Sequence, residues 1–136
     1  MNVGRLIGCR RHKFEVAMAL AQEKCLACRR DSPRVTDQEI HELLPQISLW
    51  TLTETDQIKR LERTFKFKAF QDAMAFSNAV AEIAEEAGHH PRVITEWGRV
   101  NIAWWTHKIR GLHRNDFVMA AKTDEIHSNR VSGSII

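Results

Sequence analysis

Residues 70–91, "FQDAMAFSNAVAEIAEEAGHHP", carry the clearest structural pattern in the chain. Apolar side chains recur there at spacings of three and four residues, which predicts an amphipathic helix over residues 70–87. Gly88 fits the position just past a helix end, where the backbone turns left-handed, and Pro91 cannot continue the helix. We therefore expect one long helix that stops immediately before His89 and His90. Its apolar positions are Ala73, Phe76, Val80, Ile83, Ala84 and Ala87.

A pair of strands is predicted on each side of this helix. Residues 48–68 alternate between apolar and polar side chains around a polar turn at 53–57, which is typical of a hairpin. Arg63 is a charge on the otherwise apolar face of the second strand. Residues 92–97 and 99–106 predict two more strands, joined tightly at Trp97 and Gly98, because glycine accepts the positive φ of a short turn.

Shorter helices are predicted near both ends of the chain. The sequence "TDQE" at 36–39 gives Thr36 as an N-cap and Glu39 as its capping-box partner. A last helix is expected from near Asp116 through Ile126. The order α-β-β-α-β-β-α predicts an α+β fold, in which a four-stranded antiparallel sheet has three helices packed on one face. The other face of the sheet would be free for a partner subunit.

The domain organisation is expected to be simple. Residues 33–127 are predicted to form one domain, which suits a chain of 136 residues. Residues 1–32 lack a clear pattern and are interpreted as an N-terminal appendage that is partly disordered. Residues 128–136 are interpreted as a flexible tail. Met18 lies inside the appendage and is an alternative to Met1 as the start of translation.

The three cysteines, Cys9, Cys25 and Cys28, all precede residue 30, so the predicted domain has no disulfide framework. This placement fits a cytoplasmic location. Cys25 and Cys28 form a CxxC pair, which could be half of a zinc site or a redox pair. Because no second CxxC accompanies it, two incidental thiols in a loose segment are the favoured interpretation.

Composition argues against several classes of protein. The 20 lysines and arginines barely exceed the 17 aspartates and glutamates and are scattered, so there is no electrostatic footprint for nucleic acid. No stretch approaches the roughly 18 consecutive apolar residues of a transmembrane helix. We expect a cytoplasmic protein that binds neither nucleic acid directly nor a membrane.

Three histidines are the candidates for chemistry. His89 and His90 follow the carbonyl end of the long helix, where the helix dipole favours a protonated imidazole. Pro91 steers His90 into an extended conformation, so the two rings should point in different directions. Glu85, in the last helical turn, could face one of them. His107 ends the fourth predicted strand and could return close to the pair.

Each of these features has a less specific explanation. On the histidine pair alone, a solvated helix end without chemistry is favoured over acid–base catalysis. A zinc site ranks below both, because neighbouring histidines usually diverge. Asp116 is explained equally well as an ordinary carboxylate at a helix start. Trp105 shares a strand face with His107 and could stack on a flat ring.

The spacing E-x3-H-H-P-x5-W-x9-H-x8-D closely resembles the signature of the pterin-4a-carbinolamine dehydratase family, also called 4a-hydroxytetrahydrobiopterin dehydratase. The resemblance runs from about Val35 to Ile126 and includes "RTFKFKAF", "NAVAEIAEEAGHHP" and "THKIRGL". The segment "CLACRRDSPRV" is similar to that of bacterial members associated with phenylalanine hydroxylase. Besides the histidines, the supporting positions within this spacing are Glu85, Pro91, Trp97 and Asp116. Trp50, which precedes it, is a further supporting position.

The resemblance implies a hydro-lyase built from a small α+β subunit that assembles as a homodimer or homotetramer. It would dehydrate a pterin substrate, 4a-hydroxy-tetrahydropterin, to quinonoid dihydropterin and so recycle the pterin cofactor of aromatic amino-acid hydroxylation. Phenylalanine hydroxylase is a candidate partner, and neither a metal nor an organic cofactor is implied. The catalytic histidines fall on His89, His90 and His107, and the substrate-binding segments on Gly88, Trp105, Thr106 and Lys108.

Three positions depart from the animal members of the family. Those members have aspartate at the position of Gly88, serine at Trp105 and a serine helix cap at His113. The departures leave the histidines unchanged and bear on the finer contacts with the substrate.

The chemistry agrees with imidazole as the reacting group. Imidazole gives and takes protons near neutral pH, and the reaction must protonate a leaving hydroxyl and remove a proton from N5 of the pterin. We expect His90 or His107 to be the acid and His89 to be a base or a positioning partner. The alternative is a non-catalytic dimerisation or assembly module, similar to a transcriptional coactivator, which would use the sheet face or the helices instead.

Overall fold

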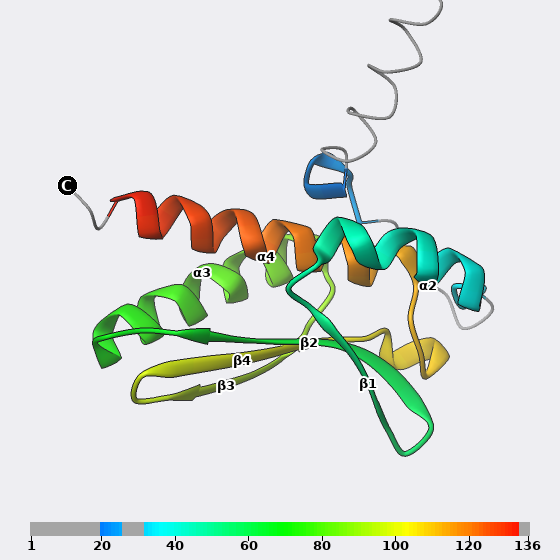
Figure 1. Ribbon diagram of the computed structural model, residues 1–136, viewed down its shortest axis with the longest axis horizontal. Helices are drawn as coiled ribbons and strands as arrows, with labels where there is room; N and C mark the ends of the chain where they lie inside the picture. Colours follow the sequence, from blue (N-terminus) through cyan, green and yellow to red (C-terminus); the bar gives the residue numbers. More distant parts are fainter. Residues whose placement is uncertain (1–19, 26–31, 134–136) are drawn as a thin grey trace, which may run out of the picture.

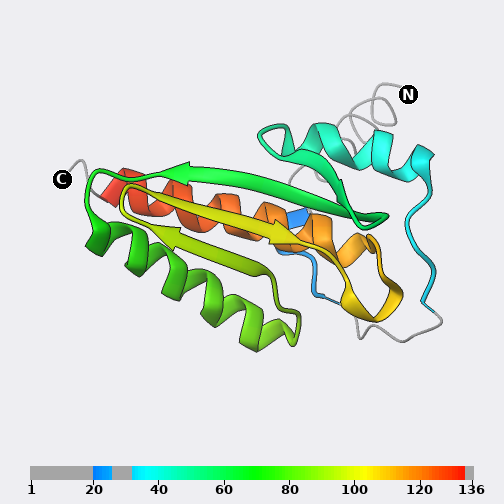
Figure 2. The ribbon, with the colours of Figure 1, turned by 90° about the horizontal axis from the view of Figure 1, so that it is seen from below.

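The computed structural model describes residues 20–25 and 32–133. Its four strands pair antiparallel in the order β1-β2-β4-β3, and the three helices lie on one face of the sheet (Figure 1, Figure 2). The predicted α+β fold is therefore confirmed. The strands are β1 (Thr51–Thr55), β2 (Ile58–Lys66), β3 (Arg92–Glu96) and β4 (Arg99–Trp104), and the helices are α2 (Asp37–Leu43), α3 (Phe70–Ala87) and α4 (Arg114–Gly133).

The helix α2 begins where the sequence predicts. Thr36 Oγ1 accepts the N–H of Glu39 at 3.1 Å, and Glu39 Oε1 accepts the N–H of Thr36 at 3.1 Å, which is the predicted capping box. Pro45 has no N–H to donate, and the chain tightens there into the 3-10 helix η1 (Leu44–Ile47).

The core lies between the inner face of the sheet and the helices. Side chains alternate along each strand, so the two central strands, β2 and β4, turn one apolar set towards α3 and α4 and a more polar set away from them. Each side chain of the apolar set is at most 1% exposed. Its members are Leu61, Phe65, Val100, Ile102 and Trp104.

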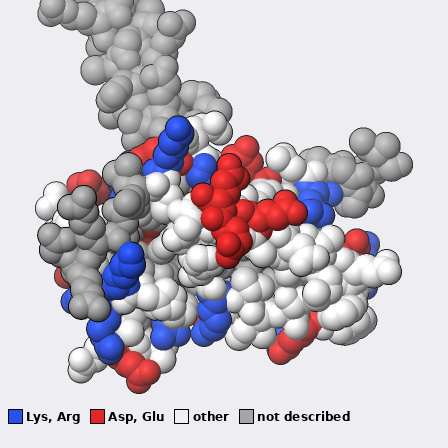
Figure 3. Space-filling view, turned by 180° about the vertical axis from the view of Figure 1, so that it is seen from behind, with Lys and Arg blue, Asp and Glu red and all other residues white. Residues whose placement is uncertain are grey.

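Charged side chains of both signs lie on one face of the molecule. On the face shown in Figure 3, the basic side chains of the described residues are scattered among acidic and uncharged ones and form no continuous stripe.

None of the helices within residues 20–25 and 32–133 combines the length and the apolar character needed to cross a membrane.

Arg63, the charge on the apolar face, pairs with a carboxylate from a helix. Its Nη1 lies 2.5 Å from Asp124 Oδ1 on α4, and its guanidinium lies 4.2 Å above the ring of Phe65. Trp50 Nε1 donates to the same oxygen of Asp124 at 2.8 Å. Burial raises the pKa of Asp124 above its usual 3.8, while the hydrogen bond from Trp50 and the charge of Arg63 act against that rise.

The structure differs from the predicted segment boundaries at both ends. Leu20, inside the predicted appendage, is only 1% exposed and belongs to the core, and α4 continues to Gly133, beyond the predicted domain end at residue 127. A single apolar residue has no periodicity, so the sequence offers no pattern that would mark Leu20 as buried. Cys9, Cys28 and the two candidate start sites, Met1 and Met18, lie outside the described residues.

His127 gives the fold a dependence on pH. Its ring packs against three phenylalanine rings at centroid separations between 4.9 and 5.8 Å. Burial, followed by the charge of Arg63, lowers the pKa of His127 below its usual 6.5, and Asp124 partly opposes this. The unfolded chain therefore takes up this proton at a higher pH than the folded chain does. The three rings are those of Phe65, Phe67 and Phe76.

We predict that the free energy of unfolding falls as the pH drops through the unfolded-state pKa of His127, and that His127→Phe weakens this fall because the variant has no proton to take up there. Urea unfolding of both proteins at about pH 7.5 and about pH 6.0 measures the difference. The exposed His41, replaced by alanine, is the control and should leave the fall unchanged. Equal losses in wild type and His127→Phe would contradict the prediction.

Candidate active site

Gly88 ends α3 and separates the directions of the two adjacent histidines. Its φ of 64° and ψ of 29° are left-handed, as predicted, and its N–H bonds to the carbonyls of Ala84 and Glu85. No atom lies within 4 Å of the place where a Cβ would sit, so the backbone conformation, not space, is what favours glycine. The side chain of His89 is 10% exposed and that of His90 is 59% exposed.

His89 points into the protein and pairs with a buried carboxylate. Its Nε2 lies 2.6 Å from Oδ1 of Asp116, which is fully buried. Its ring stacks on Trp104 with a centroid separation of 5.5 Å and an interplanar angle of 20°. The imidazole is therefore fixed in position by one polar and one aromatic contact.

Asp116 also forms part of the cap of α4. Its second oxygen, Oδ2, accepts the hydroxyl of Thr106 at 2.7 Å and the N–H of His113 at 2.9 Å. In return, His113 Nδ1 accepts the N–H of Asn115 at 3.0 Å, so a histidine takes the role that serine or threonine plays in a capping box. The helix begins at Arg114, earlier than the predicted start near Asp116, because histidine is not a usual cap signal. Both sequence interpretations of Asp116, as a helix-start carboxylate and as part of a site, describe contacts that it makes.

His90 faces outward and contacts Glu85. Its Nε2 lies 2.7 Å from Glu85 Oε1, and both side chains are exposed. This contact explains a carboxylate in the last turn of a helix, where the dipole disfavours it. Asp116 and Glu85 thus each face one of the two adjacent histidines.

Trp105 lies between an arginine and the third histidine. Its indole is 9% exposed, with the guanidinium carbon of Arg60 4.1 Å from its ring centroid and the ring of His107 4.6 Å away. Arg60 and His107 therefore cover much of the indole that the sequence suggested for stacking on a flat ring. Of the two exposed histidines, His107 thus borders Trp105, whereas His90 contacts Glu85.

The loop after β4 is closed by the backbone of Thr106. Thr106 donates its N–H to Gly111 at 2.8 Å and accepts from it at 3.4 Å, around the 3-10 helix η2 (His107–Ile109). Its hydroxyl is buried against Asp116, so Thr106 supports the carboxylate. Lys108, the other predicted substrate contact of this loop, is exposed.

Two predicted supporting residues lie away from the histidines. Trp50 contacts Asp124 and Phe65 in the core. Trp97 is 78% exposed in the β3–β4 turn, at the opposite end of β3 from His90. Pro91 links His90 to the start of β3.

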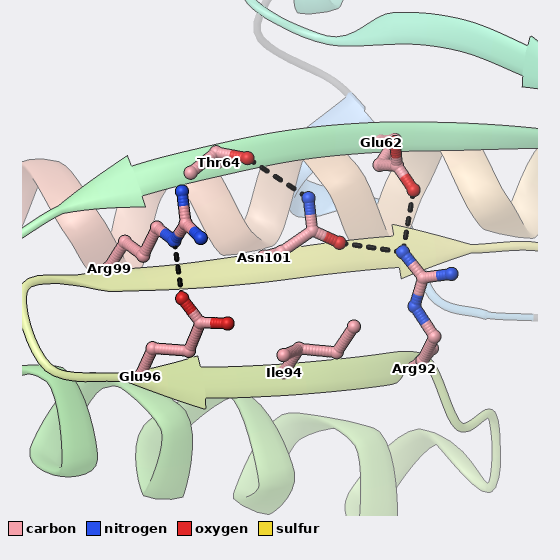
Figure 4. A pocket seen from close by; sticks show the side chains of 7 residues that line it. All are labelled: Glu62, Thr64, Arg92, Ile94, Glu96, Arg99 and Asn101. Atoms are coloured by element: carbon pink, nitrogen blue, oxygen red, sulfur yellow. Dashed lines mark hydrogen bonds and ion pairs between the residues drawn. The ribbon is translucent and has the colours of Figure 1, made fainter.

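Sequence reasoning missed a polar cavity on the outer face of the sheet. Arg92 on β3 donates from Nη2 to Glu62 at 2.6 Å and to Asn101 at 2.7 Å, and Asn101 donates to Thr64 at 3.0 Å (Figure 4). These side chains border a cavity of about 290 Å³ that begins two positions after His90. The strand alternation marked them only as outward-facing and polar, which gives no signal for a site.

No group of three or more His, Cys, Asp or Glu within residues 20–25 and 32–133 is arranged to hold a metal ion. What the arrangement offers is one imidazole fixed by a carboxylate and two exposed imidazoles, one beside Glu85 and one beside Trp105. Such a site can give and take protons on a ligand placed between them.

Comparison with known proteins places this site in a family. Residues 33–126 match the family described as pterin 4 alpha carbinolamine dehydratase. Two bacterial proteins carry the provisional name pterin-4-alpha-carbinolamine dehydratase. The one from Saccharophagus degradans is 54% identical over 108 residues, covering 79% of this chain and 96% of its own length. The one from Nitrosococcus oceani is 52% identical over 107 residues, covering 79% and 95%.

A solved structure shares the fold. The crystal structure of a transcriptional coactivator/pterin dehydratase from Brucella melitensis superposes with a TM-score of 0.62 at 33% identity, covering 69% of this chain and 98% of that one. Since the family match spans most of the chain and the two bacterial relatives are more than half identical to it, the chain belongs to the pterin-4-alpha-carbinolamine dehydratase family.

Proposed function

We propose that this protein dehydrates 4a-hydroxy-tetrahydropterin to quinonoid dihydropterin by histidine acid–base catalysis. The observation that carries the proposal is the buried His89–Asp116 pair, together with two exposed imidazoles: His90 follows His89, and His107 follows Thr106, which bonds to Asp116. Family membership supports the same reaction. The product would then be available for reduction, so that the pterin cofactor of aromatic amino-acid hydroxylation is recycled.

The reaction needs one proton delivered and one removed. The bond between C4a and the hydroxyl oxygen breaks after that oxygen is protonated, and water leaves. The N5–H bond breaks, its electron pair forms the C4a=N5 double bond, and the proton goes to a base. Water is the only other product, so the enzyme needs no oxidant, reductant or metal to balance the step.

The geometry suggests different roles for the three histidines. His89 is fixed by Asp116, whose carboxylate stabilises an imidazolium, and this suits a base or a positioning group. His90 and His107 are exposed, which suits an acid that reaches the hydroxyl of a bound ligand. Gly88, Trp105, Thr106 and Lys108 remain the proposed substrate-binding positions.

A second candidate function is a non-catalytic dimerisation or assembly module. The Brucella melitensis protein is named as both a transcriptional coactivator and a pterin dehydratase, and this double role supports the alternative. The sheet gives it a surface, because none of the helices in the described part of the chain covers the polar outer face and β3 is an edge strand. The same surface would serve a homodimer or homotetramer, or contact with phenylalanine hydroxylase.

We predict that the wild-type protein speeds the decay of freshly made 4a-hydroxy-tetrahydropterin, and that alanine in place of the acid lowers kcat by about 10²- to 10⁴-fold. Absorbance of the substrate, followed with His90→Ala and with His107→Ala, identifies which histidine is the acid. His41→Ala, an exposed histidine on α2, should retain full activity. If wild type does not exceed a buffer control, the enzyme proposal is wrong and the assembly module is preferred.

A second prediction concerns Asp116→Asn, which keeps the shape of the side chain and removes its charge. We expect a loss of at least about 10-fold in kcat, because the imidazolium of His89 loses its counter-charge. We also expect about 1–3 kcal/mol lower stability, because the cap and the Thr106 hydroxyl lose their charged acceptor. Thr106→Val, which keeps the Asp116 carboxylate, is the matched control and should lower kcat less. Equal kcat values in wild type and Asp116→Asn would exclude a role for the pair in the reaction.

A further inference from the structure

The segment Leu20–Cys25 lies along α4 and runs antiparallel to it. Lys122 Nζ donates to the carbonyl of Ala21 at 2.8 Å, and towards the start of the helix Glu23 pairs with Arg114. Leu20 anchors the segment, since it is 1% exposed within the core. This segment therefore has a defined position on the domain.

The segment also reaches the end of α3. Lys24 and Cys25 border a cavity of about 300 Å³ together with Ile83, Glu86 and Ala87 in the last turns of that helix. Gly88 and His89 follow directly. The segment thus contacts α4 at its amino end and borders a cavity at the carboxyl end of α3, the two helix ends that supply the His89–Asp116 pair.

The contact with α4 is a two-point ion pair. Arg114 Nε lies 2.9 Å from Glu23 Oε1, and Arg114 Nη2 lies 3.0 Å from Glu23 Oε2. Such a paired geometry fixes the direction of both side chains, which a single contact does not. The Glu23 carboxylate raises the pKa of the Arg114 guanidinium.

The position of Arg114 explains why this helix needs an outside carboxylate. Arg114 is the first residue of α4, where the helix dipole favours an anion and disfavours a cation. Glu23 adds a second negative charge at that end, besides that of Asp116, and offsets the cation. Two residues further along the same turn, Asp116 closes the cap and holds His89.

We propose that Glu23 is a positioning residue for the candidate site, acting through Arg114 and the first turn of α4 to hold Asp116 against His89. The expected effect of Glu23 on catalysis rests on the proposed function. Its expected effect on the position of the His89–Asp116 pair does not. The position of the pair can be observed without any turnover, so the two proposals can fail separately.

The first readout is the imidazole of His89. Long-range ¹H–¹⁵N spectra of wild type and Glu23→Gln, recorded over a pH series, follow its two ring nitrogens. We expect the His89 signals to change in Glu23→Gln, because Asp116 is no longer held in position against the imidazole. Glu96→Gln breaks the exposed Arg99–Glu96 pair at the far end of β3 and is the matched control, which should leave these signals unchanged.

The second readout is dehydration itself. We expect Glu23→Gln to lower kcat by about three- to tenfold with a smaller effect on KM, because the fault lies in the geometry of the reacting groups. Arg114→Gln should lower kcat equally, and the two changes combined should cost no more than either alone. Exchange of the charges, Glu23→Arg with Arg114→Glu, should restore kcat, since it keeps the pair and puts an acid at the helix start.

These outcomes separate the possibilities. Unchanged His89 signals in Glu23→Gln, or the same change in Glu96→Gln, would overturn the positioning role. The role would also be overturned if Glu23→Gln and Arg114→Gln both lower kcat and the charge exchange does not restore it. Urea unfolding must show that the charge-exchange variant is as stable as wild type for this outcome to count. A wild-type protein without dehydratase activity would contradict the proposed function only, and the spectra would still decide the role of Glu23.

Discussion

One buried carboxylate connects the parts of the chain that carry the candidate chemistry. Asp116 lies 2.6 Å from His89 and accepts hydrogen bonds from Thr106 and from the backbone of His113. A buried charge that loses its partner costs about 3–5 kcal/mol, so each of these groups constrains the others. The loop after α3, the loop after β4 and the start of α4 are therefore fixed relative to one another, and all three contribute candidate residues.

The alternation of side chains at the end of β4 divides this site into two sides. Trp104 faces the helices and stacks on His89, whereas Trp105 faces outward and contacts Arg60 and His107. A one-residue change of register would exchange the two tryptophans and dismantle both environments. The result is an imidazole fixed by Asp116 on the inner side, His89, and an exposed imidazole on the outer side, His107.

The sequence predicts those parts of the structure that follow from local pattern. The helix over residues 70–87, its end at Gly88 and the Thr36 cap all depend on neighbours within four residues, and all three are found. The spacing of the histidines identifies the family, and the structure brings His89 to Trp104 and His107 to Trp105. By contrast, contacts between segments that are distant in the sequence produce no periodic pattern of side chains. The Arg63–Asp124 pair, the Arg60–Trp105 contact and the burial of Leu20 depend on such contacts, and the capping role of His113 depends on a residue type that rarely caps helices.

The two helix ends at the site favour the same distribution of charge. The carbonyl end of α3 favours a cation at His89, and the amino end of α4 favours an anion at Asp116, so both dipoles stabilise an imidazolium–carboxylate pair. Arg114 works against this arrangement, because it places a cation at the amino end of α4. Its two-point contact with Glu23 offsets that charge from a different part of the chain. The charges that act on the His89–Asp116 pair therefore include those of the segment from Leu20 to Cys25 as well as those of the domain.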